Sequence, residues 1–469
     1  MNRDELSSLS LVEAAGLIRN HQLSPLELTK VCLSRIEEYD EKLKSFITIT
    51  PEAALQSARQ AEDEAQRGER FNGQPLGALH GIPIALKDLY ETRGIRTTAG
   101  SKFYAQYVPE KDAVVVDELK SAGAIFLGKT NMHEIALGLT NVNPHYGTCR
   151  NPWAADRVSG GSSGGSAVAL AAGFCLGAMG SDTGGSIRVP SALCGVVGLK
   201  PTFGRVSLRG VIPLSWNLDH AGPMARTVSD VAVMLQVIAG YDPQDAYCLD
   251  VPVEDYMGHI REGVKGWKVA LAEGEYFGLT DSQVKQAIDE AGRVFETLGA
   301  WVEPVLIPDC YQAALANGLM VTSDASVLYQ EQIQTREEDF GKDVLQRLKN
   351  GASLPLKDYI QARRTQSLLQ RKFGEFFNKF DLLLMPTTPV VAPRVEGPDA
   401  IEMARLLTRY TSPFNLTGLP ALSLPCGFNS EGLPIGLQII GRHWKEAQVL
   451  RGAFAYEQAT DWRFSKPPL

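Results

Sequence analysis

Two glycine- and serine-rich segments near the middle of the chain constrain this sequence more than any other feature. The first is 159–166 (SGGSSGGS) and the second is 180–188 (GSDTGGSIR). Glycine permits positive φ and lets peptide N–H groups approach a ligand closely. Consecutive N–H groups that point at one spot bind an anion. A hydroxyl at the end of such a loop is suited to acyl transfer, because the N–H groups stabilise the oxyanion while the hydroxyl attacks.

Other uses of such segments stay open at this point. A lone Gly/Ser loop is more often a turn or a flexible link, and phosphate binding is a further alternative. Neither segment matches GxxxxGK[ST] or GxGxxG, which weakens the phosphate alternative. No GxSxG motif surrounds Ser186, so the nucleophile elbow of the α/β-hydrolases is not indicated.

A serine nucleophile needs a base, and the sequence offers two kinds. His80 and His133 lie near other unusual segments, but neither lies in a recognisable triad motif. The alternative is a lysine whose amine is kept neutral by burial. Lys87 follows the apolar run 82–86 (IPIAL), which would carry it into the interior. A lysine at a strand end is more often solvated, so the pattern alone leaves the base open.

Apolar segments that predict strands alternate with amphipathic segments that predict helices. The strands are expected at 82–86, 124–127, 176–179, 267–272, 302–307, 381–385, 421–425 and 435–440, and the helices at 113–122, 164–173, 227–239, 281–298 and 446–458. Residues 1–68 are expected to form an N-terminal helical arm, with capping boxes that begin at Ser10 and Ser24. This order predicts an α/β fold with a mixed, mostly parallel central sheet covered on both faces by helices. Residues 1–469 are expected to form a single domain.

Composition and charge narrow the classes of partner. The formal net charge is −8 and no basic stripe occurs, so direct nucleic-acid binding is not expected. The seven cysteines are scattered without a CxxC pair, which argues against a zinc site or a disulfide framework. The first residues lack the apolar core of a signal peptide, and no apolar run is long enough to span a membrane. We therefore expect a cytoplasmic protein that does not bind membranes.

Taken together, these segments resemble the amidase signature family. The similarity includes GIPIALKD at 81–88, GKTNMHE at 128–134 and the whole block 158–205. It continues in MPTTP at 385–389 and NLTGLPA at 415–421, so it extends over essentially the full chain. The resemblance implies the α/β amidase fold and a serine hydrolase that needs no cofactor and no metal.

The resemblance also implies a Ser–cis-Ser–Lys triad. Its lysine corresponds to Lys87, its bridging serine to Ser162 and its nucleophile to Ser186. In that chemistry, neutral Lys87 takes a proton from Ser162, which takes one from Ser186 as Ser186 attacks the carbonyl. The proton then returns to the leaving nitrogen, and water hydrolyses the acyl-enzyme.

Further positions take their expected roles from the same resemblance. The oxyanion hole corresponds to the backbone N–H groups of Thr183, Gly184, Gly185 and Ser186. Met132 corresponds to a position that often lines the substrate channel, and we expect it to contribute to substrate binding.

The substrate class divides the family. In the A-type chains of tRNA-dependent amidotransferases, which look very similar, an aspartate anchors the glutamine ammonium, and Thr408 stands at that position here. The segment 209–216 (RGVIPLSW) also resembles free-standing amidases. The prediction is therefore a free-standing hydrolase of small-molecule amides, and also of carbamates or esters. The alternative is the glutaminase component, the A-type chain, of a tRNA-dependent amidotransferase.

A binding protein on an inactive scaffold is disfavoured, because Lys87, Ser162 and Ser186 are all present. The expected partner is a small amide substrate. The helical arm is compatible with a homodimer.

Overall fold

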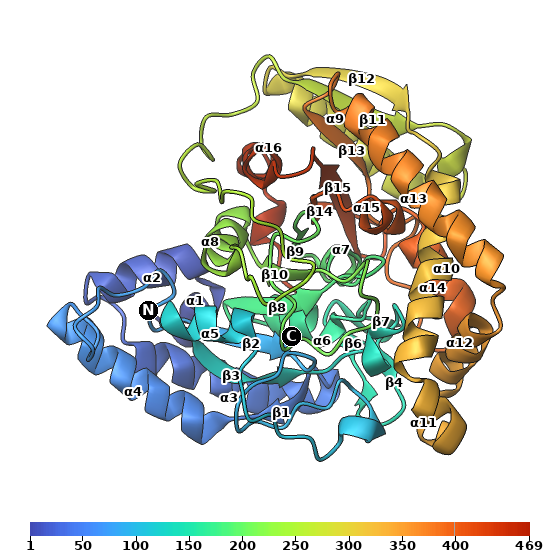
Figure 1. The fold of residues 1–469 in the computed structure, drawn as a ribbon. Coiled ribbons are helices and arrows are strands. Elements are labelled where there is room, and N and C mark those ends of the chain that lie inside the picture. Colours follow the sequence, from blue (N-terminus) through green and yellow to red (C-terminus); the bar gives the residue numbers. More distant parts are fainter. Residues whose placement is uncertain (398) are drawn as a thin grey trace.

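The centre of the computed structural model, which describes residues 1–397 and 399–469, is a large sheet. Over those residues the sheet has 11 strands (Figure 1). In spatial order they are β1 (Phe46–Ile49), β3 (Ile125–Thr130), β2 (Pro83–Lys87), β8 (Gly177–Ser181), β10 (Ala221–Ala225), β9 (Val197–Lys200), β14 (Ala421–Phe428), β15 (Pro434–Ile440), β13 (Leu382–Pro386), β11 (Lys268–Glu273) and β12 (Trp301–Leu306). Four short strands lie outside it: β4 (Val142–Asn143), β5 (Gly147–Thr148), β6 (Arg150–Asn151) and β7 (Ala154–Val158).

The strand directions divide the sheet into blocks. Parallel pairs occur in β3-β2-β8 and in β13-β11-β12. Antiparallel pairs join β1 to β3 and connect the strands between the two blocks. The sheet is mixed, as predicted, and it is more evenly mixed than the alternation of helices and strands indicates. One reason is that β14 and β15 are joined by a short connection, which permits only antiparallel pairing.

Helices cover both faces of the sheet, which confirms the predicted α/β class. One group consists of α5 (Val114–Ser121), α8 (Val228–Ile238), α9 (Ser282–Thr297) and α16 (Glu446–Gln458). Another consists of α6 (Gly164–Ala171) and α7 (Arg188–Cys194), which pack on each other and on the middle strands. Both α6 and α7 follow the two Gly/Ser segments, so their starting points fix where those loops lie.

The N-terminal segment is mostly helical, as predicted, but it also supplies an edge strand. Its helices are α1 (Arg3–Ser8), α2 (Leu11–Arg19), α3 (Pro25–Leu43) and α4 (Pro51–Arg67), drawn in blue in Figure 1. Ser10 caps α2 in a capping box, and Ser24 caps α3. Strand β1 lies between α3 and α4 and pairs with β3. The arm is therefore continuous with the central sheet.

A further helical layer was not predicted. It contains α10 (Cys310–Leu328), α11 (Gln330–Thr335), α12 (Lys342–Ala352), α13 (Leu356–Phe376), α14 (Ala400–Thr408) and α15 (Ser412–Leu416), which gather on one side of the molecule in Figure 1. Five short 3-10 helices complete the described part of the chain: η1 (Lys102–Tyr104), η2 (Glu134–Ala136), η3 (Glu275–Phe277), η4 (Glu337–Asp339) and η5 (Trp462–Phe464). Residues of α10, α12, α14 and α15 line the cavity described below, together with the loop that follows β8.

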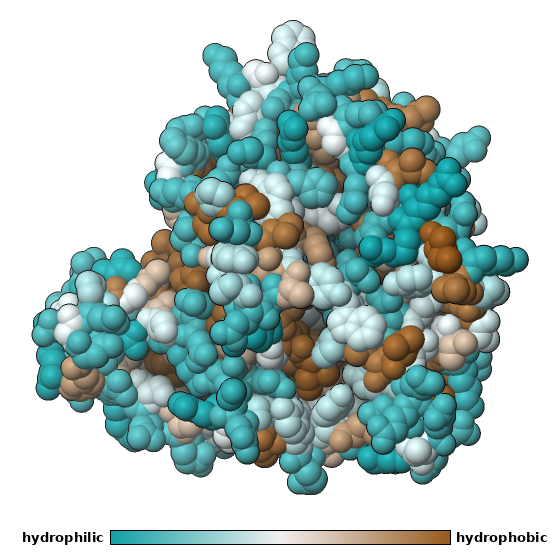
Figure 2. All heavy atoms as spheres, viewed as in Figure 1, coloured by the Kyte–Doolittle hydropathy of each residue, from teal (hydrophilic) through white to brown (hydrophobic). Residues whose placement is uncertain are grey.

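The interior of the protein is mostly apolar and the surface is mostly polar. Apolar side chains of the central strands are buried, whereas Ile49, Trp301 and Leu306 of the two edge strands are exposed. The face shown in Figure 2 is mostly hydrophilic with small hydrophobic groups scattered over it. In the part of the chain that the structure describes, no helix combines the length and the apolar character that a membrane crossing requires.

Candidate active site

Lys87 lies at the carboxyl end of β2, in the interior of the protein. Strand β2 runs parallel to β8 beside it, so the two strands end at the same edge of the sheet and bring Lys87 next to Ser181. The lysine Nζ lies 2.7 Å from Ser162 Oγ and 2.8 Å from Ser181 Oγ. The side chain is fully buried, and this burial lowers the pKa of Lys87 to about 7, against the opposing influence of Asp182 and Asp219. Such an amine can accept a proton near neutral pH.

Ser162 is presented by the first Gly/Ser loop. The peptide bond between Gly161 and Ser162 is cis, as the resemblance implies. Gly160 has a φ of 75°, and a Cβ there would lie 2.8 Å from the Cα of Pro190, so only glycine fits. The carbonyl oxygen of Ser162 accepts a hydrogen bond from the His133 N–H at 3.2 Å. These contacts hold the Ser162 side chain against Lys87.

Ser186 ends the second Gly/Ser loop, which follows β8. Its carbonyl oxygen accepts the Ser163 N–H at 3.1 Å, and this bond joins the two loops. At Gly185 a Cβ would lie 2.2 Å from Thr411 Oγ1, which donates to the Gly184 carbonyl. Within the described residues, no hydrogen bond is formed by Ser186 Oγ or by the backbone N–H groups of 183–186. The loop therefore presents a free hydroxyl and free N–H donors together.

Asp182 and Arg188 anchor this loop from behind. The arginine Nε and Nη2 donate to the two carboxylate oxygens of Asp182, each at 3.0 Å, and both side chains are fully buried. Asn415 also donates to Asp182, at 2.8 Å. Burial alone would raise the pKa of Asp182, but the Arg188 guanidinium outweighs it and holds that pKa well below its usual range. Neither side chain lines the cavity described next, so the pair supports the loop from outside the cavity.

A cavity of about 610 Å³ opens beside Ser186. Part of its wall is apolar and is made by Leu137, Leu139, Leu214, Leu315 and Leu319. The charged side chains in its described lining are all cationic, namely Arg347, Arg405 and Arg409. A cavity of this size holds a small molecule and favours one with an anionic group.

Two polar side chains in the cavity lie over the loop 183–186. Asn317 Nδ2 donates to the Thr183 carbonyl at 3.2 Å. Thr408 lines the same cavity, and its hydroxyl donates to the Ala404 carbonyl at 2.7 Å within α14. A Cβ at Gly184 would lie near both side chains, at 3.3 Å from Asn317 and 3.7 Å from Thr408. Thr408, which stands where the amidotransferase pattern has an aspartate, thus faces this cavity.

The arginines of the cavity wall were not predicted from the sequence, and Met132 is not among the residues that line the cavity. Arg347 lies on α12 and Arg405 on α14, and neither helix was predicted. Arginines with no motif around them look like solvated surface residues, so the sequence carried no signal for them. Met132 was expected to line the substrate channel, but it does not reach the cavity. It is fully buried in the main core, beside Gly100.

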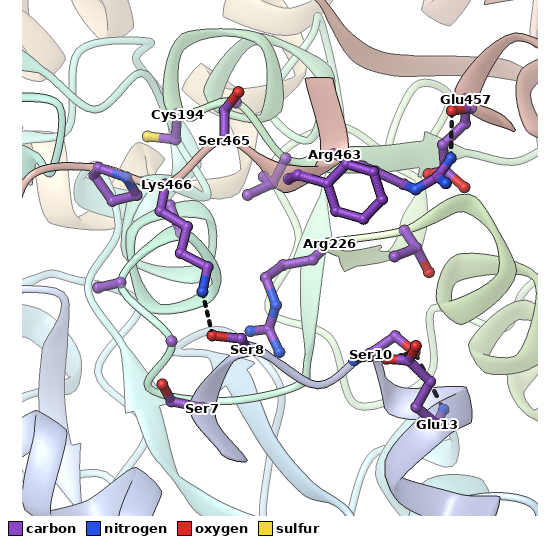
Figure 3. Close-up of a pocket in the computed structure, with 18 of the residues that line it drawn as sticks. Ser7, Ser8, Ser10, Glu13, Cys194, Arg226, Glu457, Arg463, Ser465 and Lys466 are labelled. Atoms are coloured by element: carbon purple, nitrogen blue, oxygen red, sulfur yellow. Dashed lines mark hydrogen bonds between the residues drawn. The ribbon is translucent and has the colours of Figure 1, made fainter. Parts of the chain in front are cut away.

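A second cavity, of about 770 Å³, lies between the N-terminal arm and the C-terminal tail (Figure 3). Several of its cationic side chains are already engaged. Arg226 donates to backbone carbonyls that include Cys175, Arg463 to the Glu457 carbonyl, and Lys466 to Ser8 Oγ. Because these bonds tie the chain ends to the core, we assign this cavity a structural role.

The fold and this site define a hydrolase that acts on carbon–nitrogen bonds. The family model described as amidase matches residues 27–450. The chain therefore belongs to the amidase family, the amidase signature hydrolases that the sequence resembles.

Curated relatives are similar over the whole chain. The A-type chain of the glutamyl-tRNA(Gln) amidotransferase of Moorella thermoacetica is 41% identical, with 99% of each chain covered. The corresponding chain of Geobacter sp. (strain M21) is 37% identical, covering 99% of this chain and all of the relative. These relatives do not support the prediction that the chain stands closer to free-standing amidases.

Solved structures of both kinds share the fold. The A-type chain of the Thermotoga maritima glutamyl-tRNA(Gln) amidotransferase superposes with a TM-score of 0.82 at 35% identity, covering 97% of this chain and 95% of that one. A chain from a structure described as a vestigial protein complex, revealing the origins of an s-triazine catabolic enzyme, superposes with a TM-score of 0.91. It is 33% identical and covers 96% of this chain and 98% of its own.

Proposed function

We propose that this chain hydrolyses a small amide through an acyl-enzyme, with Ser186 as nucleophile, Ser162 as proton relay and Lys87 as base. The observation that carries the proposal is the 2.7 Å contact between the buried Lys87 Nζ and Ser162 Oγ. A neutral amine has one lone pair, so it can donate to Ser181 while accepting the Ser162 proton. The same relay returns the proton to the leaving nitrogen, which an amide requires.

The second Gly/Ser loop supports this chemistry. The N–H groups of 183–186 are without partners among the described residues and follow one another on a loop held from behind by Asp182 and Arg188. Donors fixed in this way stabilise the oxyanion of the tetrahedral intermediate without reorganising during the reaction. We therefore propose these N–H groups as the oxyanion hole.

The cavity lining favours an amide that carries a carboxylate. Arg347, Arg405 and Arg409 are the charged groups in its described lining. Two guanidinium groups near one another repel, and burial together with Arg405 lowers the pKa of Arg347, against the attraction of Asp343. A bound carboxylate would relieve that repulsion and could accept two parallel hydrogen bonds from one guanidinium. We propose a small monoamide with an anionic group as the substrate class.

A second candidate is the amide-hydrolysing component of an amidotransferase. It is favoured by the full-length similarity to relatives that are described as such components. Under this hypothesis the substrate is glutamine, and a partner chain takes up the ammonia. Glutamine carries an ammonium beside its carboxylate, and Thr408 gives that ammonium no charge partner. The relatives thus favour the amidotransferase hypothesis, and the cavity favours a substrate without an ammonium group.

Ammonia release by the purified chain separates these candidates. The substrates are succinamate, which has a carboxylate, glutamine, which has a carboxylate and an ammonium, and butyramide, which has neither. A carboxylate-specific hydrolase turns over succinamate with the highest kcat/KM. An amidotransferase component prefers glutamine and depends on a partner chain and tRNA. Equal turnover of succinamate and butyramide would contradict the role given to the arginines.

The relatives also indicate which kind of partner to expect. Because the relatives are described as components of an amidotransferase, we propose a partner chain of another sequence as the first assembly to look for, ahead of a homodimer.

A further inference from the structure

We propose that His133 is a positioning residue that holds Asp343 away from Arg347 and thereby leaves Arg347 free to bind the substrate carboxylate. This inference rests on the proposed function. It assigns a role to a histidine that is not part of the proposed proton relay and does not line the cavity.

Asp343 and Arg347 lie one helical turn apart on α12. Residues at i and i+4 share a helix face, where an aspartate and an arginine normally pair. Among the described residues, however, these two side chains form no ion pair with each other. Asp343 instead contacts the His133 imidazole, with 3.0 Å between Oδ2 and Nε2. The histidine therefore occupies the carboxylate that would otherwise neutralise Arg347.

The charges around Asp343 support this arrangement. Burial alone would raise the pKa of Asp343, but His133 first and Arg347 second outweigh it and lower that pKa to about 2. Asp343 is thus an anion that lies between His133 and Arg347. If the His133 imidazole is removed, the carboxylate can pair with Arg347.

The His133 ring is locked in place. It is almost fully buried, and a Cβ on Gly138 would lie 2.1 Å from its Nε2, so the absence of a side chain at Gly138 creates the space for the ring. Its backbone N–H donates to the Ser162 carbonyl. His133 therefore links the loop that carries Ser162 to the helix that carries Arg347.

The start of α12 is held independently of His133. Glu134 is fully buried, and its Oε2 accepts the Gly341 N–H at 2.7 Å, directly before α12. Its Oε1 accepts hydrogen bonds from Ser101 and His145. Because these bonds do not involve the His133 imidazole, a substitution at His133 is expected to leave the backbone of α12 where it is.

Arg347 is placed to bind an anion. One of its nitrogens, Nη2, donates to the Ala400 carbonyl at 3.1 Å, while Nε is buried without a partner among the described residues. Arg347 and Ser186 line the same cavity. If Asp343 turned to this guanidinium, it would compete with the substrate carboxylate for the same donors.

The test compares His133→Leu with the double variant His133→Leu/Asp343→Asn. His133→Leu should raise KM for succinamate about tenfold, with kcat and KM for butyramide nearly unchanged, because only the anion meets the competing carboxylate. The double variant should restore the wild-type KM. His133→Gln, which keeps an N–H donor, should stay close to wild type. If His133→Leu does not fold, His133→Asn replaces it, since its shorter side chain does not reach Asp343.

A binding measurement keeps this test independent of turnover. The Kd for succinate, measured by calorimetry, should rise in His133→Leu and recover in the double variant. An equal rise for succinamate and butyramide, or no recovery in the double variant, would overturn the role of His133. A wild-type chain that binds no succinate and shows no preference for succinamate would instead overturn the proposed substrate class, whatever the variants do.

Discussion

The protonation state of the Lys87 amine depends strongly on its burial in the site. It is fully buried at the end of β2, and the hydroxyls of Ser162 and Ser181 are its hydrogen-bonding partners among the described residues. A fully buried lysine loses much of the hydration that stabilises its charged form. The neutral amine that acyl transfer requires is therefore accessible near neutral pH.

The pH dependence of activity should report this amine. The log of kcat/KM for succinamate is expected to rise with slope one up to about pH 7 and then to level off, because burial lowers the pKa of Lys87 to about 7. Lys87→Arg should be inactive across the whole range, because a guanidinium stays protonated. A flat profile between pH 5.5 and 9, or an active Lys87→Arg, would contradict the assigned base.

The same residue makes stability depend on pH. Between about pH 7 and the ordinary lysine pKa of about 10.4, the unfolded chain binds the Lys87 proton and the folded chain does not. The free energy of unfolding should therefore rise with pH in this window and gain nothing from Lys87 above it. Lys87→Met should lack this component when urea unfolding of the two proteins is compared at pH 7 and pH 9.

Substitution of Thr408 tests whether the cavity can be made to bind a substrate that carries an ammonium group. Thr408→Asp would place a carboxylate in a cavity whose described charges are cationic, so it should weaken succinamate binding and supply a partner for an ammonium. The ratio of kcat/KM for glutamine over succinamate is expected to rise at least tenfold, measured by ammonia release. Thr408→Asn, equal in size but neutral, is the matched control and should leave the ratio near wild type.

At the scale of elements, the sequence specified the loops and the first parallel strands well. Periods of apolar residues and the capping signals placed β2, β8, α2 and α3 close to their observed bounds. The Gly/Ser segments placed the proposed relay, because their glycines fit only where backbone or side chains approach closely. The sequence also aligned Thr408 with the substrate-anchoring aspartate of the amidotransferase pattern, and Thr408 does line the cavity.

The layer of α10 to α15 could not be predicted in the same way. Helix α10 mixes small, polar and apolar residues without a clean stripe, and the leucines at 356 and 368 of α13 are exposed. Such helices are determined by tertiary contacts that one sequence does not display. The arginines that line the cavity lie in or next to this layer, which explains why the sequence indicated the residues of the proposed relay but not the cationic wall.

Substitutions in the Asp182–Arg188 pair test how strongly this ion pair stabilises the second Gly/Ser loop. Asp182→Asn leaves the buried guanidinium without its carboxylate, and the free energy of unfolding should fall by about 3–5 kcal/mol. Asp182→Leu/Arg188→Met removes both charges and should cost less stability than Asp182→Asn. Urea unfolding measures both variants. A loss below about 1 kcal/mol in Asp182→Asn would contradict the anchoring role.

At the scale of the whole molecule, we propose that the arm and the catalytic core form one domain. Strand β1 of the arm pairs with β3, which pairs with β2, and β2 carries Lys87. Apolar residues of α2 and α3 belong to the same core cluster as those of β2 and β8. The arm is therefore coupled to the site through the sheet.

Deletion of residues 1–68 tests this continuity. It would expose the edge of β3 and apolar core surface, so the remainder should aggregate or lose its cooperative unfolding transition. The checks are size-exclusion chromatography and the near-UV circular dichroism signal. A monomeric remainder with native unfolding would show that the arm is a separate unit.

We propose that the neutral amine of Lys87 activates Ser186 through Ser162. The most direct measurement is the rate at which a fluorophosphonate modifies the protein, with the modified peptide identified by mass spectrometry. We expect one phosphonyl group per chain on Ser186, at a rate that falls at least a hundredfold in both Lys87→Met and Ser162→Ala. Labelling of another residue, or wild-type labelling of Ser186 in Lys87→Met, would contradict this claim.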